Sequence, residues 1–311
     1  MSATRKTLVG ILESNPWVYV LKLPEIGRGL ISATDIPQGT VIHTELPIVS
    51  CSALGTNGCR VCLTPGGSGN LPDCCHHGEM MMKGGYGPGA RWRMIEDGCA
   101  WDPLFEYCDT HGERFPLLVA QLACMRVARA MYGDSGASID DRDMENLCYA
   151  SMQDIPDAWK DSHDCLMQCF PDMLRADDVI SLGWYADMMR RVHPNAFRVD
   201  LIDTVGLERD YAAALRSMFA AQESQKSCGS AIYLLSSLFN HSCSPNVEPM
   251  FPYNNHMVEM KATRKIEKNE HLCISYIDSE NLSVQERQHK LLHGYGFQCR
   301  CEKCLEEMVS L

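Results

Sequence analysis

Four cysteines in the last quarter of the chain have the types and the spacing of metal ligands. Cys299, Cys301 and Cys304 follow a C-x-C-x2-C pattern. This spacing lets three thiolates converge on one ion but leaves a tetrahedral site one ligand short, and Cys243 is the natural fourth. Because a site with four cysteines has no open coordination position, the sequence predicts a structural zinc that ties the tail back to the segment around Cys243.

A second group of candidate ligands lies between residues 51 and 116, where Gly, Cys and His are frequent and periodicity is weak. Cys59-x2-Cys62 and Cys108-x2-His111 have metal-ligand spacing. Either zinc orders this segment, or it is a loose glycine-rich insertion. A further site could draw on Cys74, Cys75, His76, His77 and Cys99.

Composition narrows the class of protein. The chain has 311 residues, of which 45% are apolar, so it can bury a proper core. Its 17 cysteines are odd in number and no secretion signal precedes them, which favours metal ligands and free thiols over disulfides. No stretch reaches the roughly 18 apolar residues of a membrane span. The net charge of −12 disfavours nucleic-acid binding and favours a cationic partner, although acidic proteins are common.

Strands and tight turns are expected near both ends of the chain. Residues 17–22 and 41–45 alternate like half-buried strands, and Gly27-Arg28-Gly29 stands between them. The two glycines let the backbone approach a ligand closely, although a plain hairpin explains the same residues. The strand pattern returns in three later segments, at residues 248–251, 256–261 and 271–276.

Helices are expected between these regions. Pro116 stands at a helix-starting position, and apolar residues recur at helical spacing up to Gly133. Residues 159–191 have the pattern of two or three short helices, interrupted at Pro171 and stopped by Pro194. Further helices are predicted at 209–222, at 231–239 and, from the capping box of Ser283 and Glu286, up to Gly294.

Three motifs follow one another near the end of the sequence: N-H-S-C-x-P-N at residues 240–246, Ser275-Tyr276, and Y-G-F-x-C-x-C-x2-C at residues 295–304. Taken in order, they resemble the SET-domain lysine methyltransferases, and among them the SMYD (SET and MYND) group. The resemblance covers residues 17–50 and 195–311. It implies an α+β fold: a SET fold of several short β-sheets with a zinc-rich and helical insertion and a zinc-binding post-SET tail.

The resemblance also implies a cofactor, S-adenosyl-L-methionine, and roles for particular residues. Methyl transfer to an amine needs alignment and a neutral lysine rather than a strong base. Tyr276 and Tyr295 would be the catalytic residues, one orienting the amine and the other lining its channel. Without the flanking motifs, Tyr276 would simply end a strand. The implied cofactor contacts are Gly27, Arg28, Gly29, Asn195, Asn240, His241, Tyr276 and Phe297.

The resemblance divides the chain into five parts. These are the N-terminal part of the SET domain (17–50), a degenerate MYND-like zinc-binding insert (51–115), a helical insertion (116–194), the C-terminal core of the SET domain (195–280), and a post-SET helix with the zinc tail (281–311). The usual ladder of MYND cysteine pairs is incomplete here. Zinc would be structural, because the closed four-cysteine tail site has no open position, with one ion in the tail and one or more in the insert.

The expected function is an S-adenosylmethionine-dependent protein-lysine N-methyltransferase, acting on lysines of histones or other proteins. Two alternatives stay open: a catalytically silent SET-fold adaptor that binds partners through its zinc module, and, more remotely, a redox-sensing thiol protein. We expect a monomer that binds a Lys-containing protein or peptide, with no nucleic acid or membrane involved. The expected location is the cytoplasm, the nucleus or both.

Overall fold

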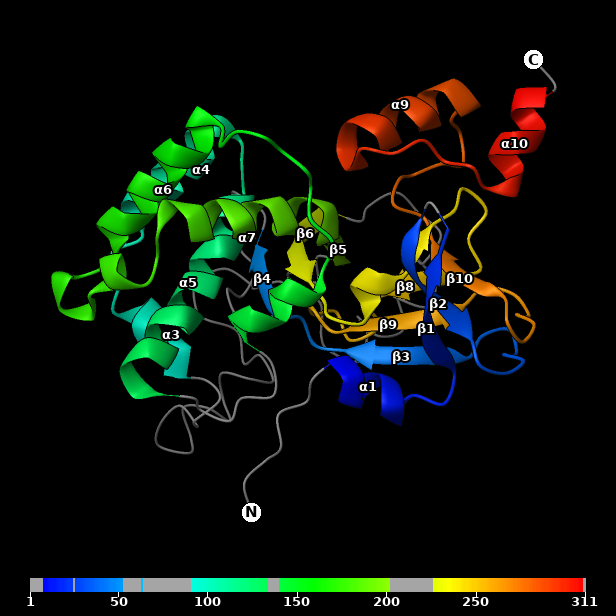
Figure 1. Ribbon diagram of the computed structural model, residues 1–311, viewed down its shortest axis with the longest axis horizontal. Helices are drawn as coiled ribbons and strands as arrows, with labels where there is room; N and C mark the ends of the chain where they lie inside the picture. Colours follow the sequence, from blue (N-terminus) through cyan, green and yellow to red (C-terminus); the bar gives the residue numbers. More distant parts are fainter. Residues whose placement is uncertain are drawn as a thin grey trace, which may run out of the picture.

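Three small β-sheets and a group of helices build the molecule (Figure 1). The computed structural model describes residues 8–24, 26–52, 63, 91–133, 140–201 and 226–309. The strand orders of the three sheets are β1-β2-β10-β7, β3-β9-β8 and β4-β6-β5. Several short sheets with separate helices are the α+β arrangement that the sequence predicted.

The first sheet joins the two ends of the chain. β1 (Val18–Leu23) and β2 (Gly27–Ser32) form an antiparallel hairpin, and β10 (His271–Ile274) pairs with β2. β10 also pairs in parallel with the two-residue strand β7 (Asn240–His241). Gly27 opens β2 with a φ of 90°, a conformation that side chains with a Cβ rarely adopt. The sheet therefore brings residues near 28, 240 and 272 together.

The second sheet contains the predicted hairpin. β8 (Val247–Met250) pairs with β9 (Val258–Ala262), and β9 pairs with β3 (Val41–Glu45). The turn before β10 contains Asn269 at a φ of 68°, which suits asparagine better than most residues with a side chain. The pairing confirms the strands predicted at 41–45, 248–251 and 256–261.

The third sheet corrects one prediction. β6 (Lys226–Ile232) lies between β4 (Val49–Ser52) and β5 (Ala196–Leu201), and η5 (Ser236–Leu238) is a single 3-10 turn. The helix predicted at 231–239 was therefore wrong. A short apolar run fits a buried strand as well as a buried helix, and here its neighbours in the sheet decide. The helix predicted at 209–222 lies outside the described residues.

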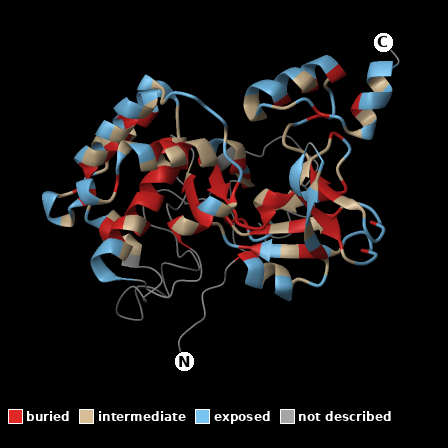
Figure 2. Ribbon diagram, in the orientation of Figure 1, coloured by how far each residue is buried: buried red, intermediate tan, exposed pale blue. Residues whose placement is uncertain are grey.

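The helices between β4 and β5 gather on one side of the sheets (Figure 1). The long helix α5 (Phe115–Tyr132) has a proline in its first turn and ends at Gly133, as predicted. Its side chains are buried on most sides, and one hydrophobic core runs from it into the sheets (Figure 2). The helices and 3-10 turns beside it are α3 (Arg91–Asp97), α4 (Asp102–His111), η2 (Asp141–Asn146), α6 (Asp157–Cys169), η3 (Asp172–Leu174), η4 (Ala176–Asp178) and α7 (Leu182–Asn195).

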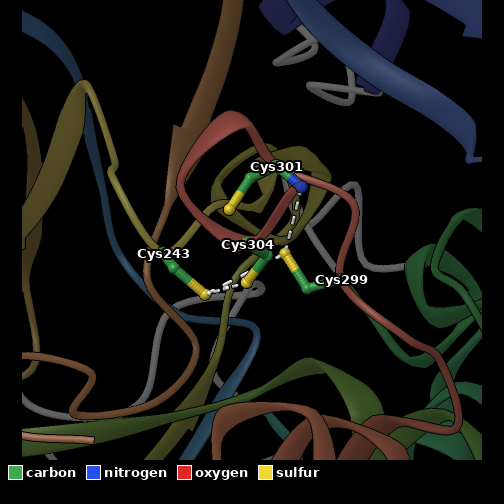
Figure 3. Close-up of side chains that lie close together, drawn as sticks. All are labelled: Cys243, Cys299, Cys301 and Cys304. Atoms are coloured by element: carbon green, nitrogen blue, oxygen red, sulfur yellow. Dashed lines mark hydrogen bonds between the residues drawn. The ribbon is translucent and has the colours of Figure 1, made fainter. Parts of the chain in front are cut away.

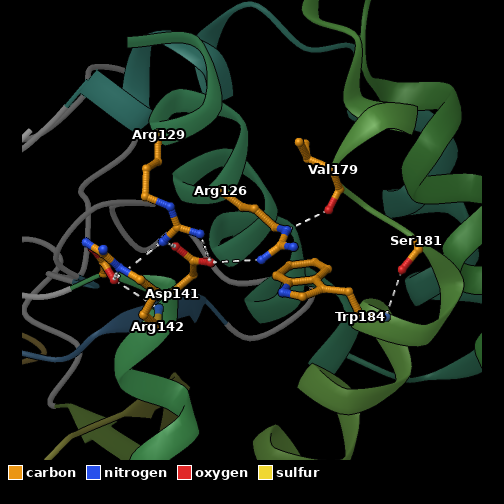
Figure 4. A network of polar contacts seen from close by, with 8 residues as sticks. Arg126, Arg129, Asp141, Arg142, Val179, Ser181 and Trp184 are labelled. Atoms are coloured by element: carbon orange, nitrogen blue, oxygen red, sulfur yellow. Dashed lines mark hydrogen bonds and ion pairs between the residues drawn. The ribbon is translucent and has the colours of Figure 1, made fainter. Parts of the chain in front are cut away.

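Charged side chains fix η2 against α5 and join α5 to α7 (Figure 4). Arg129 donates two hydrogen bonds to the buried carboxylate of Asp141, at 2.6 and 3.1 Å. Arg126 donates to the carbonyl of Val179 and stacks over the ring of Trp184 in α7. A bidentate pair of this kind has a defined geometry, so η2 is held in one position.

The remaining helices lie at the two ends of the chain. α1 (Leu8–Ser14) precedes the first strand, and α9 (Val284–Tyr295) and α10 (Glu302–Val309) follow the last. Ser283 and Glu286 form the predicted capping box of α9, although the helix ends at Gly296 rather than Gly294. In the part of the chain that is described, no helix combines the length and apolarity needed to cross a membrane.

Candidate active site

The Asn240–His241 step lies beside the glycine turn of β2. The side-chain amide of Asn240 donates to the carbonyl of Arg28, with Nδ2 and O 3.0 Å apart. Nδ2 also lies 3.2 Å from Nε2 of His271. Burial lowers the pKa of His271, so this imidazole is neutral and can accept that hydrogen bond. The structure thus brings the predicted residues 27–29 and 240–241 together.

Gly29 is the point of closest approach in this contact. A Cβ at this position would lie 2.7 Å from Nδ2 of Asn240 and 2.8 Å from Nε2 of His271. Both distances are shorter than any real Cβ contact. Gly29 therefore lets the backbone of β2 pass directly under the Asn240 amide.

Replacing Gly29 by alanine is expected to destabilise the protein by about 1–3 kcal/mol, as an overpacked site does, and to displace the Asn240 side chain. Urea denaturation measures the loss. Gly294 is the matched control, because its Cβ would meet nothing within 4 Å in α9, where alanine favours the helix. Equal stability of the two variants would contradict the close contact.

Tyr276 stands at the centre of an aromatic group that three segments build. Its hydroxyl donates to the carbonyl of Phe239 at 2.7 Å, and its backbone amide donates to Nδ1 of His241 at 3.0 Å. Tyr295, at the end of α9, donates its hydroxyl to the carbonyl of Tyr276 at 3.1 Å. The ring centroid of Tyr276 lies 5.3 Å from His241, 4.9 Å from Tyr295 and 6.4 Å from Phe297.

Protonation states in this group follow from burial. Burial raises the pKa of Tyr276 and of Tyr295, so both phenols are neutral and act as donors. Burial lowers the pKa of His241 to about 4, with Cys301 opposing the shift and Arg287 adding to it. Because Nδ1 of His241 accepts from the Tyr276 amide, its proton lies on Nε2, which is 3.3 Å from the Cys243 sulfur. Neutral aromatic faces of this kind attract cations and hold apolar groups.

The four predicted tail ligands lie together (Figure 3). The sulfurs of Cys243, Cys299, Cys301 and Cys304 all lie within 4.8 Å of one another. The sulfur of Cys243 is 3.9 Å from that of Cys299 and 3.6 Å from that of Cys304. Zinc–sulfur bonds of about 2.3 Å at tetrahedral angles place sulfurs about 3.8 Å apart. The donor set and its spacing therefore fit a closed tetrahedral zinc site.

The helical insertion reaches the site through the end of η2. The guanidinium of Arg28 donates to the carbonyl of Asn146. Asn195, predicted to touch the cofactor, is buried and donates to the carbonyls of Cys148 at 2.8 Å and Arg191 at 2.7 Å. Its amide nitrogen thus holds the segment after η2 in the structure, while a cofactor contact of Asn195 stays a prediction.

The predicted zinc site of the insert is described only in part. Cys59 and Cys62, like Cys74 to His77, lie outside the described residues. Cys108 is buried in α4, where burial raises its pKa to about 12, and Nδ1 of His111 lies 2.8 Å from the carbonyl of Tyr107. Within the described ranges, the tail cysteines alone form a group of three or more metal-binding side chains. A metal in the insert stays a prediction.

Two buried residues near the site had no role in the sequence-based hypothesis. Both oxygens of the Glu45 carboxylate accept hydrogen bonds, from the amides of Leu234, Leu235 and Ser236 and from the Ser236 hydroxyl, at 2.8–3.0 Å. This fixes the turn that precedes Phe239. Asn246 accepts from the amide of Cys273 and donates to the carbonyl of His271, which joins its loop to β10. Asn246 belongs to the 240–246 motif, so the sequence could have identified it as a structural residue. For Glu45, no neighbouring residue in the sequence indicates its role.

A family model and several curated proteins match this chain. The model described as SET domain matches residues 27–277. The histone-lysine N-methyltransferase ATXR4 of Arabidopsis thaliana is 28% identical over 289 residues, which is 89% of this chain and 83% of that protein. The protein-lysine N-trimethyltransferase SMYD5 of Gallus gallus is 43% identical over 81 residues, 25% of this chain. That match spans only 19% of the length of SMYD5.

Solved structures are also similar to this chain. One of them is the SET domain of LSMT bound to lysine and AdoHcy, with a TM-score of 0.42 and 14% sequence identity. The similarity covers 92% of this chain and 53% of that one.

Proposed function

The chain belongs to the SET domain family, and from this premise we propose that it is an S-adenosylmethionine-dependent protein-lysine N-methyltransferase. The family match includes Gly27 to Gly29, the Asn240–His241 step and Tyr276. The observation that supports the activity most directly is the hydroxyl of Tyr276, fixed by the Phe239 carbonyl within the aromatic group. Proteins with the matching names act on histones or other protein lysines, so the substrate proposed here is a lysine side chain of a protein.

S-adenosylmethionine, when bound, supplies a methyl group on a sulfonium. The chain would hold it through the backbone and side chains of residues 27–29, Asn240 and His241, with Phe297 against the adenine. Asn240 is already aligned by the Arg28 carbonyl, so little reorganisation is needed.

The reaction itself requires alignment rather than an ionised base. The target lysine must be neutral, and burial among aromatic side chains favours loss of its proton. The hydroxyl of Tyr276 donates its hydrogen bond to the Phe239 carbonyl. The lone pairs of the Tyr276 oxygen therefore remain available to the reacting groups. Tyr295 would line the lysine channel, because its ring lies beside that of Tyr276.

The activity can be tested directly. Protein is incubated with methyl-labelled S-adenosylmethionine and lysine-rich proteins, histones included, and the labelled residues are identified by mass spectrometry. Calorimetry with S-adenosylhomocysteine measures cofactor affinity independently of any substrate. Label on lysine supports the proposal. Absence of both label and affinity would contradict it and leave the adaptor role. The acceptors tested are nuclear and cytoplasmic proteins, since we propose those compartments as the place of action.

Zinc in the tail would order the aromatic group without touching substrate, because Tyr295 ends α9 and Phe297 stands between that helix and Cys299. Removing zinc with a chelator is expected to raise amide exchange in residues 284–309 and to abolish binding of S-adenosylhomocysteine. Hydrogen exchange and metal analysis on one sample measure this. Exchange in α5 is the internal control. Unchanged exchange in the tail after zinc loss would contradict the structural role.

A further inference from the structure

Arg287 is a buried charge beside the cysteine cluster. It lies in α9, and its side chain is only 1% exposed. Arginine is almost never this buried unless its charge is compensated. The tail forms its own small core of Val284, Leu291 and the cysteines, so the guanidinium is enclosed among apolar and sulfur atoms.

The contacts of Arg287 join three parts of the tail. Nη1 donates to the carbonyl of Leu282 at 2.6 Å, and Nη2 donates to Glu307 of α10 at 2.9 Å. Nη2 also lies 3.6 Å from the sulfur of Cys304. The Nε atom is buried and has no hydrogen-bond partner among the described residues. The guanidinium of this α9 residue thus contacts the segment before α9, the cysteine cluster and α10.

Charge explains why a cation is buried at this position. Four thiolates around a divalent zinc carry a net charge of about −2, whereas four protonated thiols carry none. The carboxylate of Glu307 is 39% exposed, so water weakens its pairing with Arg287. A negative metal–thiolate centre is therefore a better partner for this guanidinium than the metal-free cluster. By the same attraction, the guanidinium favours the deprotonated, metal-loaded ligands over the protonated ones.

We propose that Arg287 is a positioning residue of the tail metal centre, which holds the Cys304 thiolate through an N–H···S contact and strengthens the affinity of the site for zinc. The proposal depends on the proposed tail zinc and not on methyl transfer, so it can fail or hold independently of the activity. Outer partners of metal ligands change metal affinity by about 10–100-fold when they are removed.

The test compares full-length Arg287→Met with Lys290→Met, an exposed lysine of the same helix. A chromogenic chelator measures zinc affinity, and the tail ion is identified as the one that a Cys301→Ser variant lacks in native mass spectra. Arg287→Met is expected to bind this ion about 10–100-fold more weakly, and Lys290→Met to match the wild type. Wild-type affinity in Arg287→Met would overturn the proposal. So would a wild-type protein with no zinc at this site.

A purely structural role of Arg287 would not alter the metal's spectrum. In the cobalt-loaded protein, the sulfur-to-cobalt charge-transfer bands are expected to shift in Arg287→Met, because loss of an N–H···S contact raises the energy of the sulfur electrons. If Arg287→Met does not fold, the zinc affinities of Arg287→Lys and Arg287→Gln are compared instead. The comparison requires that these two variants have similar melting temperatures. Lysine keeps the charge and is expected to bind zinc at least tenfold more tightly than glutamine. Equal affinities of this pair would refute the role.

Discussion

Methyl transfer by Tyr276→Phe is expected to fall by about 10²–10³-fold in kcat, the loss typical of removing one preorganised polar group from a transition state. The phenylalanine ring keeps the packing against Tyr295 and Phe297. The buried Phe239 carbonyl loses one donor, which costs about 1–3 kcal/mol of stability and leaves the fold intact. Activity and stability should therefore separate in this variant.

Single-turnover rates with saturating substrate measure the effect on Tyr276→Phe, and calorimetry with S-adenosylhomocysteine shows whether cofactor affinity survives. Tyr253→Phe is the matched control, because the exposed hydroxyl of Tyr253 is bonded to Glu259, away from the aromatic group. If Tyr276→Phe transfers methyl groups at a rate within threefold of Tyr253→Phe, the catalytic role of Tyr276 is contradicted.

Glu45→Ala is expected to cost about 3–5 kcal/mol of unfolding free energy, which is a large part of the stability of an ordinary domain. The substitution leaves the amides of residues 234–236 and the Ser236 hydroxyl without their buried acceptor. His43, 3.5 Å away, loses its anion as well. Because the turn at 234–236 leads directly to Phe239 and Asn240, methyl transfer should fall with stability.

Acid should remove the contribution of Glu45. Burial alone would raise the pKa of this carboxyl, but the nearby His43 side chain and hydrogen bonds from the amides of Ser236 and Leu235 outweigh it and lower the pKa below its ordinary value of 4.5. A group whose folded-state pKa is lowered stabilises the fold above its unfolded pKa and loses that effect as the pH falls through the folded value. The stability difference between wild type and Glu45→Gln should therefore be constant near neutral pH and shrink below about pH 4.5.

Urea denaturation at several pH values measures both Glu45 effects. Glu280→Ala, at an exposed position, is the control and should change stability by less than about 0.5 kcal/mol. A loss below about 1 kcal/mol in Glu45→Ala would mean that the turn at 234–236 is held by other contacts.

The parts that sequence could predict are those with local signals. The capping box of Ser283, the proline and glycine that bound α5, and the β8-β9 hairpin each depend on neighbouring residues, and each is present. SET-domain membership followed from motifs in a fixed order, and the family match confirms it.

The parts that sequence could not supply depend on distant partners. The carboxylate of Glu45 acts on amides 189 to 191 positions away, and nothing near residue 45 indicates them. From the sequence pattern, Arg287 would be an exposed polar residue of an amphipathic helix. Only the packing against α10 shows that it is buried. The strand at β6 was missed because its partners, β4 and β5, are distant in sequence.

The pairing of β2 with β10 affects how the chain folds during its synthesis. Ile31 and His271 are register partners, so β2 can pair with β1 early but cannot gain its second partner until most of the polypeptide has been synthesised. Contacts this far apart in sequence form slowly, because a long loop must close first. On the ribosome, the nascent chain would expose the edge of β2 for most of translation. We therefore expect chaperones to engage this hairpin during synthesis.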